Sequence, residues 1–159
     1  MVAKKLTHLD AHGAMHMVDV GSKAPTERRA VAKGKLKVST ETLTLVRSGR
    51  TKKGDVLAAA RLAGIMAAKR TSDLIPLCHP LMLSAVTVNI AVGEGVVSIE
   101  AIVETTGQTG VEMEALTACS VAALTIYDMC KSADKSMVIG ELALWEKSGG
   151  RSGTFQRPE

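Results

Sequence analysis

The residues with the clearest capacity for chemistry are an acid and a base three positions apart, Asp128 and Lys131. On a helix this spacing places both side chains on one face. Most such pairs are exposed ion pairs that contribute little to stability, and spacing alone favours that interpretation. Asp128 lies, however, within the largely apolar stretch 125–131. A partly desolvated carboxylate and ammonium can exchange protons with shifted pKa values.

Lys53 is a candidate anion-binding residue. It lies two positions before Asp55, which is a good helix N-cap. The first N–H groups of a helix attract negative charge, so a lysine there can help to hold a phosphate. The alternative is an ordinary solvated loop, because Arg50 and Lys52 are close by.

His79 is a candidate proton-transfer residue because Pro76 and Pro80 stiffen the loop around it. A general acid or base must be held within hydrogen-bond reach of its proton. A loop histidine bonded to the backbone is the simpler interpretation of this residue alone. Cys78 has no evident Cys or His partner, so we expect it to be a neighbour of the chemistry rather than a nucleophile.

Glu112 and Glu114 follow the Gly-rich stretch 107–110. Carboxylates there can accept the paired N–H groups on the edge of a guanine or pterin ring, although Glu112 also has the capping-box spacing from Thr109. Glu114 and Asp128 are fourteen positions apart, which is about 21 Å along one helix. One nucleotide-sized ligand can hardly contact both ends within a single chain. We therefore predict an oligomer with its sites at subunit interfaces.

A metal site is not expected. His8, His12 and His16 recur every four residues, which on a helix could suggest metal ligation. Gly13 and the weakly alternating segment 14–20 argue against a helix, and no HExxH-type motif accompanies them.

The elements that must position these residues can be predicted from the sequence pattern. Helices are expected over 55–70, apolar almost all round, and over 110–131, with an apolar stripe. Alternating apolar residues predict a hairpin of strands over 86–92 and 97–104. The other expected elements are strands over 29–38 and 137–145, the latter with a bulge at Gly140, an edge strand over 14–20, and a short helix over 41–47.

The main order is strand, helix, strand, strand, helix, strand. This βαββαβ order predicts an α+β, ferredoxin-like fold, an antiparallel sheet with helices on one face. The chain has 159 residues, so we expect a single domain over 1–159 with loose ends at about 1–13 and 147–159. The fold hosts many functions and does not decide among them.

Composition narrows the class of ligand. Only 2% of residues are aromatic, so a surface that stacks successive bases, as in an RNA-binding domain of this fold, is not expected. The net charge of +4 is too small for a protein that coats nucleic acid, and it suits a small polyanion.

Sequence features also indicate the compartment. Three cysteines without a CxxC pattern predict a reducing environment. We expect no signal peptide, because no apolar segment follows the two lysines near the start. No apolar run approaches the ~20 residues that span a bilayer. We therefore expect a cytoplasmic protein without membrane or nucleic-acid partners.

Six stretches together identify a family resemblance. The two longest are Asp73–Leu81 (DLIPLCHPL) and Thr109–Thr117 (TGVEMEALT). The shorter ones are His16–Val20, Lys53–Val56, Ala67–Thr71 and Tyr127–Lys131. In register from about residue 6 to residue 153, the sequence closely resembles the cyclic pyranopterin monophosphate synthases, the molybdenum cofactor biosynthesis accessory protein C family.

The resemblance implies a lyase that converts 3′,8-cyclo-7,8-dihydro-GTP to cyclic pyranopterin monophosphate with release of pyrophosphate. It also implies a homohexamer, built as a trimer of dimers, whose substrate comes from an upstream radical GTP cyclase. It implies no required cofactor, although Mg²⁺ can accompany the substrate phosphates. From the residues alone, the competing hypothesis is a non-catalytic nucleotide-sensing module, which would bind this precursor without releasing pyrophosphate.

The resemblance further assigns roles to individual residues. The implied catalytic residues are Asp128, its partner Lys131, Lys53 and His79. The implied substrate-binding residues are Leu77, Cys78, His79, Met113, Glu114, Glu112, Arg28 and Lys147, with Arg151 as a basic position in the tail loop. On this basis Arg28, Lys53 and Lys147 hold the triphosphate, and Glu114 holds the guanine-derived ring.

Overall fold

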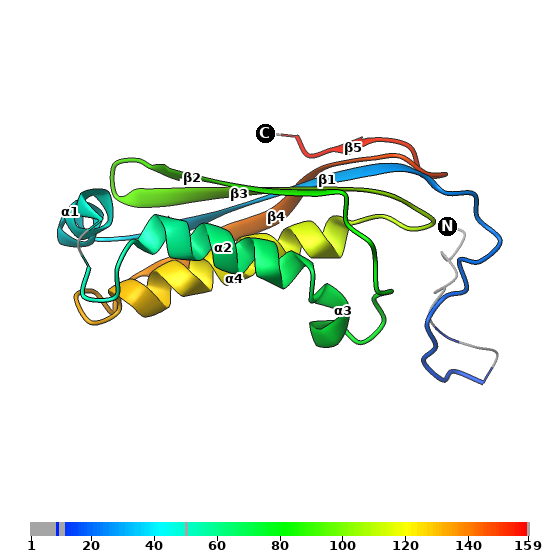
Figure 1. Cartoon of the computed structure of the whole chain (residues 1–159), viewed down its shortest axis with the longest axis horizontal. Coiled ribbons are helices and arrows are strands. Elements are labelled where there is room, and N and C mark those ends of the chain that lie inside the picture. Colours follow the sequence, from blue (N-terminus) through cyan, green and yellow to red (C-terminus); the bar gives the residue numbers. More distant parts are fainter. Residues whose placement is uncertain (1–8, 10–11, 50, 159) are drawn as a thin grey trace.

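In the computed structural model, which describes residues 9, 12–49 and 51–158, helices lie on one face of an antiparallel sheet (Figure 1). The strands are β1 (Thr26–Lys37), β2 (Ala85–Val92), β3 (Val96–Gly107), β4 (Val138–Ser148) and β5 (Phe155–Gln156). The helices are α1 (Thr40–Ser48), α2 (Val56–Ala68), α3 (Thr71–Leu74) and α4 (Glu112–Cys130). The strand order β2-β3-β1-β4-β5 contains the arrangement predicted from the βαββαβ pattern. The ferredoxin-like α+β fold is therefore confirmed.

The core lies between the sheet and the two long helices, α2 and α4, which run antiparallel to each other (Figure 1). Alternate residues of β3 are fully buried toward the helices, among them Val97, Ile99 and Ala101. α4 has the length and composition of a membrane-spanning helix. Burial of its inner side against the sheet and α2 accounts for that composition, because a helix packed on more than one side is apolar over most of its surface.

Gly64 sets how closely α2 approaches α4. A Cβ at this position would lie 2.9 Å from the carbonyl oxygen of Ala118 and 3.1 Å from Val88 Cγ2. We expect Gly64→Ala to lower the free energy of unfolding by about 1–2 kcal/mol, because the overpacking cost exceeds the gain in helix propensity. Urea denaturation measures this. Gly140→Ala is the control, since a Cβ there meets nothing within 4 Å; equal stability of the two variants would contradict the prediction.

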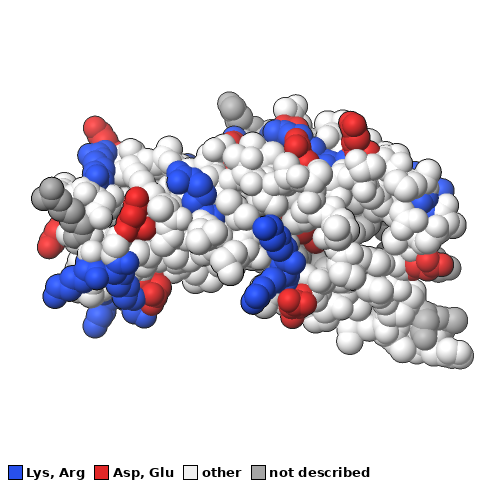
Figure 2. Space-filling view, in the orientation of Figure 1, with Lys and Arg blue, Asp and Glu red and all other residues white. Residues whose placement is uncertain are grey.

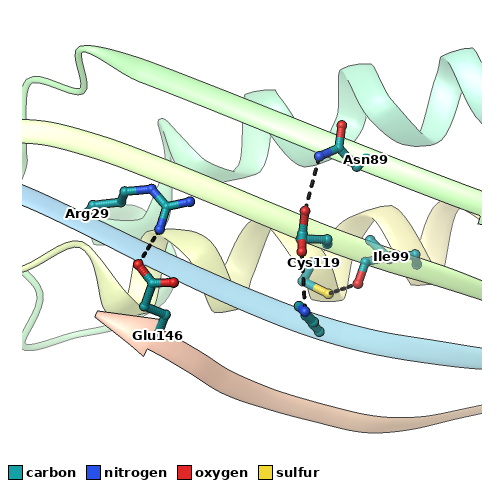
Figure 3. Close-up of polar contacts among 7 residues, drawn as sticks. Arg29, Asn89, Ile99, Cys119 and Glu146 are labelled. Atoms are coloured by element: carbon teal, nitrogen blue, oxygen red, sulfur yellow. Dashed lines mark hydrogen bonds and ion pairs between the residues drawn. The ribbon is translucent and has the colours of Figure 1, made fainter. Parts of the chain in front are cut away.

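The opposite face of the sheet is polar and largely self-neutralised. Arg29 on β1 pairs with Glu146 on β4, and Asn89 on β2 donates to Glu100 on β3 (Figure 3). Further ion pairs on this face join Lys33 to Glu100 at 3.4 Å and Lys35 to Glu141 at 2.6 Å. Below the sheet, the Cys119 thiol of α4 donates to the Ile99 carbonyl at 3.8 Å (Figure 3).

Two expected strand features are wrong. Residues 16–20 form no strand, and Met15 makes only an isolated bridge to Leu9. The physical reason is that its backbone bonds elsewhere: the Val18 carbonyl lies 2.9 Å from His79 Nε2, and the Val20 carbonyl accepts from the Lys23 N–H at 3.0 Å. β4 has two irregularities opposite β1, at 141–142 and at Trp145, whereas Gly140 keeps its pairing with Lys35. Glu141 takes the positive φ of 52°.

Two further expectations at chain ends and helix ends are corrected. The expected loose end 147–159 is partly strand, because Lys147 and Ser148 belong to β4 and β5 pairs with β4. The expected capping box is absent: the N-cap of α4 is Val111, and no side chain caps it. The loop before α4 is held instead from outside, by Arg28, as described below.

Candidate active site

Asp128, in the last turn of α4, accepts hydrogen bonds from two lysines. Its Oδ1 lies 2.7 Å from Lys131 Nζ, and its Oδ2 lies 2.7 Å from Lys53 Nζ. Lys53 Nζ also donates to the main-chain oxygen of Asp128 at 3.0 Å, near a helix end where carbonyls lack intrahelical partners. We call Asp128, Lys131 and Lys53 the acid–lysine cluster. The sequence spacing predicted the contact between Asp128 and Lys131 but not the contact between Asp128 and Lys53.

The two lysines dominate the electrostatics of the cluster. Hydrogen bonds from Lys131 and Lys53 lower the pKa of Asp128 to about 2. The same contact with Asp128 raises the pKa of Lys131. All three side chains are about half exposed, so the partial desolvation expected from the apolar stretch is absent within a single chain. At neutral pH the cluster therefore holds one carboxylate between two ammonium groups.

A tight turn and a helix cap present Lys53 to Asp128. In the turn, Gly54 N–H donates to the Thr51 carbonyl at 3.0 Å, and the Thr51 hydroxyl donates to the Gly54 carbonyl at 2.7 Å. Asp55 then caps α2 by accepting from the N–H groups of residues 57 and 58. Because α2 and α4 are antiparallel, the start of α2 lies beside the end of α4, where Asp128 is (Figure 1).

Most of the other predicted residues lie at the opposite end of α4, around two adjoining clefts. The basic cleft has a volume of about 610 Å³, and its lining includes Lys23, Arg28, Glu112, Lys147 and Arg151. The loop pocket has a volume of about 290 Å³, and its lining includes Val18, Leu77, Cys78, His79, Glu112, Met113 and Glu114. Lys23, Thr109, Gly110 and Glu112 line both clefts. The two clefts therefore form one continuous surface.

Arg28 is fixed in the wall of the basic cleft by the loop before α4. Its Nε donates to the Gly107 carbonyl at 3.2 Å, and its Nη2 donates to the Gln108 carbonyl at 3.3 Å. Gly150 has a φ of +71°, and a side chain there would collide with the Arg28 guanidinium. Lys147 Nζ, across the cleft, contacts the Ser152 hydroxyl. The cleft thus presents cations from three separate segments, which suits a polyanion.

His79 and Glu114 differ in environment within the loop pocket. His79 Nε2 lies 2.9 Å from the Val18 carbonyl oxygen; because a carbonyl only accepts, Nε2 carries the proton and Nδ1 is left for exchange. Glu114 is buried, and this burial, with a smaller contribution from the charge of Glu112, raises its pKa to about 6. Burial, followed by the charge of Glu114, raises the pKa of Cys78, which keeps it a thiol at neutral pH.

The structure thus assembles two groups of residues rather than one site. The acid–lysine cluster lies at the end of α4, whereas Glu112 at the start of α4 lines both clefts. Lys23 was missed by the sequence analysis, and its only sequence signal is its place after the Gly21–Ser22 pair. Of the three histidines considered for metal binding, His8 lies outside the described residues. Among the residues that are described, no three His, Cys, Asp or Glu side chains come together to hold a metal ion.

The chain is similar to known proteins over most of its length. A model of the MoaC family matches residues 17–150. The cyclic pyranopterin monophosphate synthase of Heliobacterium modesticaldum is 60% identical over 156 residues, which cover 97% of this chain and 98% of that protein. The proteins of the same name from Desulfitobacterium hafniense and Thermomicrobium roseum are 58% identical over 156 residues and 59% identical over 157 residues. Each alignment covers 98% of this chain and 96% and 95% of those proteins, respectively.

Proposed function

The chain belongs to the MoaC family, and from this premise we propose that it converts 3′,8-cyclo-7,8-dihydro-GTP to cyclic pyranopterin monophosphate and pyrophosphate. The reaction is a step of molybdenum cofactor biosynthesis, and the substrate is a nucleotide-derived small molecule. The observation that carries the proposal is the meeting of Asp128 with two lysines at 2.7 Å. A sensing module has no use for a carboxylate held between two ammonium groups, whereas a rearrangement of the base needs a proton acceptor beside proton donors.

The two clefts supply the binding groups in this proposal. Arg28 and Lys147, with Lys23 and Arg151, hold the triphosphate in the basic cleft and stabilise the charge that develops on departing pyrophosphate. Glu114, with Glu112 beside it, accepts hydrogen bonds from the guanine-derived ring in the loop pocket. Leu77, Cys78 and Met113 enclose the ring, and His79 exchanges a proton at Nδ1.

The substrate must contact both the clefts and the acid–lysine cluster, which lie at opposite ends of α4. Because one ligand cannot span that distance within a single chain, a second subunit completes the site. Met113 and Leu124 are exposed on α4, with Leu116 and Ser120 half-buried between them. Together with Asp128 they recur at helical spacing on one side of α4. Ser120 is the middle residue of this row, with Met113 seven positions before it and Asp128 eight positions after it. A two-fold, antiparallel pairing of α4 helices would therefore place Asp128 beside the partner subunit's Met113.

Surface chemistry supports this pairing. Leu62 and Met66 of α2 are exposed beside α4. In Figure 2 the middle of this face is mostly uncharged surface with a few separate charged groups, whereas Lys and Arg gather at the end where α4 stops. Burial by a partner would desolvate the acid–lysine cluster, which is half exposed in one chain. The family resemblance further implies that three such dimers form a hexamer. We place this hexamer in the cytoplasm, where an upstream radical GTP cyclase supplies its substrate. The reaction requires no cofactor, although Mg²⁺ can accompany the phosphates.

Incubation with the cyclised GTP precursor tests the proposed activity. We expect stoichiometric release of pyrophosphate, measured by a phosphate assay, and formation of cyclic pyranopterin monophosphate, detected by mass spectrometry. Tight binding of the precursor without pyrophosphate release would instead identify a nucleotide-sensing module and contradict the proposal.

Substrate binding should weaken as the pH falls through about 6, where Glu114 becomes protonated. The protonated carboxyl has lost acceptor capacity toward the ring, so the Kd should rise about tenfold for each pH unit below that pKa. Calorimetry with the precursor and Asp128→Asn, which binds without turnover, measures this. Glu114→Gln in the same background is the control, because it retains the titration of the substrate phosphates and lacks that of Glu114. The same change of log Kd with pH in both proteins would refute the role of Glu114 as acceptor for the ring.

A further inference from the structure

Asp134 is a buried carboxylate that the proposed reaction does not use. It is 7% exposed and accepts four hydrogen bonds. Its Oδ1 accepts from the Ser136 hydroxyl at 2.6 Å and the Ser136 N–H at 2.8 Å. Its Oδ2 accepts from the Ser39 N–H at 3.0 Å and the Thr42 hydroxyl at 3.3 Å. Among the residues described by the structure, no lysine or arginine forms an ion pair with it.

The position of Asp134 connects two helices. Its own N–H donates to the Cys130 carbonyl at 3.1 Å, so Asp134 continues the end of α4 just beyond Lys131. Ser39 is the N-cap of α1, and Thr42 lies in its first turn and is fully buried. The positive end of the α1 dipole favours a carboxylate at that point. Hydrogen bonds from Ser136 and Ser39 lower the pKa of Asp134, which keeps it ionised at neutral pH.

The chain that follows α1 carries Lys53, a member of the acid–lysine cluster. α1 ends at Ser48, and its C-cap Gly49 stops the helix with a φ of 63° and an N–H bond to the Val46 carbonyl. The turn closed by Thr51 and Gly54 follows a few residues later and presents Lys53 to Asp128. α1 is therefore held at its start by the end of α4, and the chain that leaves its other end returns to α4 through Lys53.

We propose that Asp134 is a positioning residue for the acid–lysine cluster. It ties the start of α1 to the end of α4 and so sets where Lys53 meets Asp128. The two contacts through Oδ2 reach α1, whereas the two through Oδ1 stay within the loop after α4. Only the Oδ2 contacts should matter for the position of Lys53. The inference rests on the proposed function of the cluster.

Two single-hydroxyl variants separate positioning from general stability. Thr42→Val removes the 3.3 Å bond to Oδ2, and Ser136→Ala removes the 2.6 Å bond to Oδ1. Thr42→Val also removes the 3.0 Å bond that its hydroxyl accepts from the Ser39 hydroxyl, so thermal stability is measured for both variants. If Asp134 only stabilised the fold, losses of kcat should follow losses of thermal stability. Positioning predicts that Thr42→Val loses about tenfold in kcat beyond that relation, because small misplacement of reacting groups is costly. Ser136→Ala stays near wild type. Losses of kcat that simply follow the loss of thermal stability would overturn the proposal.

A second readout does not depend on turnover. In protein labelled with ¹³C at aspartate carboxyls, the pKa of Asp128 should rise in Asp134→Asn from about 2 toward its ordinary value near 4, because Lys53 moves away. Lys131 is the other charged group that faces Asp128, and it stays on the same helix. The acid limb of the kcat–pH profile should move in the same direction. An unchanged Asp128 pKa would overturn the positioning role. Full turnover in Asp128→Asn would instead refute the proposed function and leave the pKa result standing.

Discussion

Replacing Asp128 with asparagine should reduce pyrophosphate release at least about a thousandfold while leaving the protein folded. Asparagine cannot accept a proton and removes the charge that holds Lys53 and Lys131 at 2.7 Å. The side chain is about half exposed in one chain, and exposed ion pairs contribute little to stability. Circular dichroism and size-exclusion chromatography should therefore match the wild type. Lys131→Ala should lose turnover to a similar extent.

Glu141→Gln is a matched control for Asp128→Asn. Glu141 is also an exposed carboxylate whose lysine partner, Lys35, lies at 2.6 Å and lowers its pKa. It lies on β4, on the polar face of the sheet and away from both clefts. We expect wild-type turnover in this variant. Appreciable product formation by Asp128→Asn, or equal losses in the two variants, would rule out the proton-accepting role of Asp128.

Local sequence patterns sufficed to predict the main elements. Strict alternation predicted β2 and β3, because a strand with one buried face has period two. Asp55 was correctly placed as the cap of α2, since its acceptor oxygen reaches only two and three residues ahead. Such features depend on residues adjacent in the chain, so they could be inferred before any tertiary contact was known.

The errors share a different cause, which is contact between distant segments. The loop before α4 is held by Arg28, about 80 residues earlier, so the local capping-box pattern did not decide its conformation. Segment 14–20 failed to become a strand because His79, 61 residues away from Val18, binds its backbone. A second long-range contact, from Gln108 Nε2 to the Gly21 carbonyl at 3.2 Å, holds the chain next to Lys23, which lines both clefts. Sequence spacing also understated the cluster, because Lys53 meets Asp128 across 75 residues.

The separation of the clefts from the acid–lysine cluster leads to the second large expected effect. Asp128→Asn and Glu114→Gln should each be inactive alone, since each damages every site in its oligomer. In a mixed dimer with a shared site, one site receives both substitutions and the other receives neither. Random mixing makes half of the dimers mixed, so activity should return to about a quarter of the wild-type level. Co-expression of the two variants at equal levels, without selection for mixed dimers, followed by the pyrophosphate assay, measures it.

Co-expression of Asp128→Asn subunits with Lys131→Ala subunits is the control for this recovery of activity. These two residues lie 2.7 Å apart in the same cluster, so in a mixed dimer each shared site still lacks one of them. No activity should return. If a site were instead built within one chain, every site would carry one substitution in either mixture, and both would stay inactive. Recovery limited to the first pair therefore requires that Asp128 of one subunit and Glu114 of the partner subunit act on the same substrate molecule.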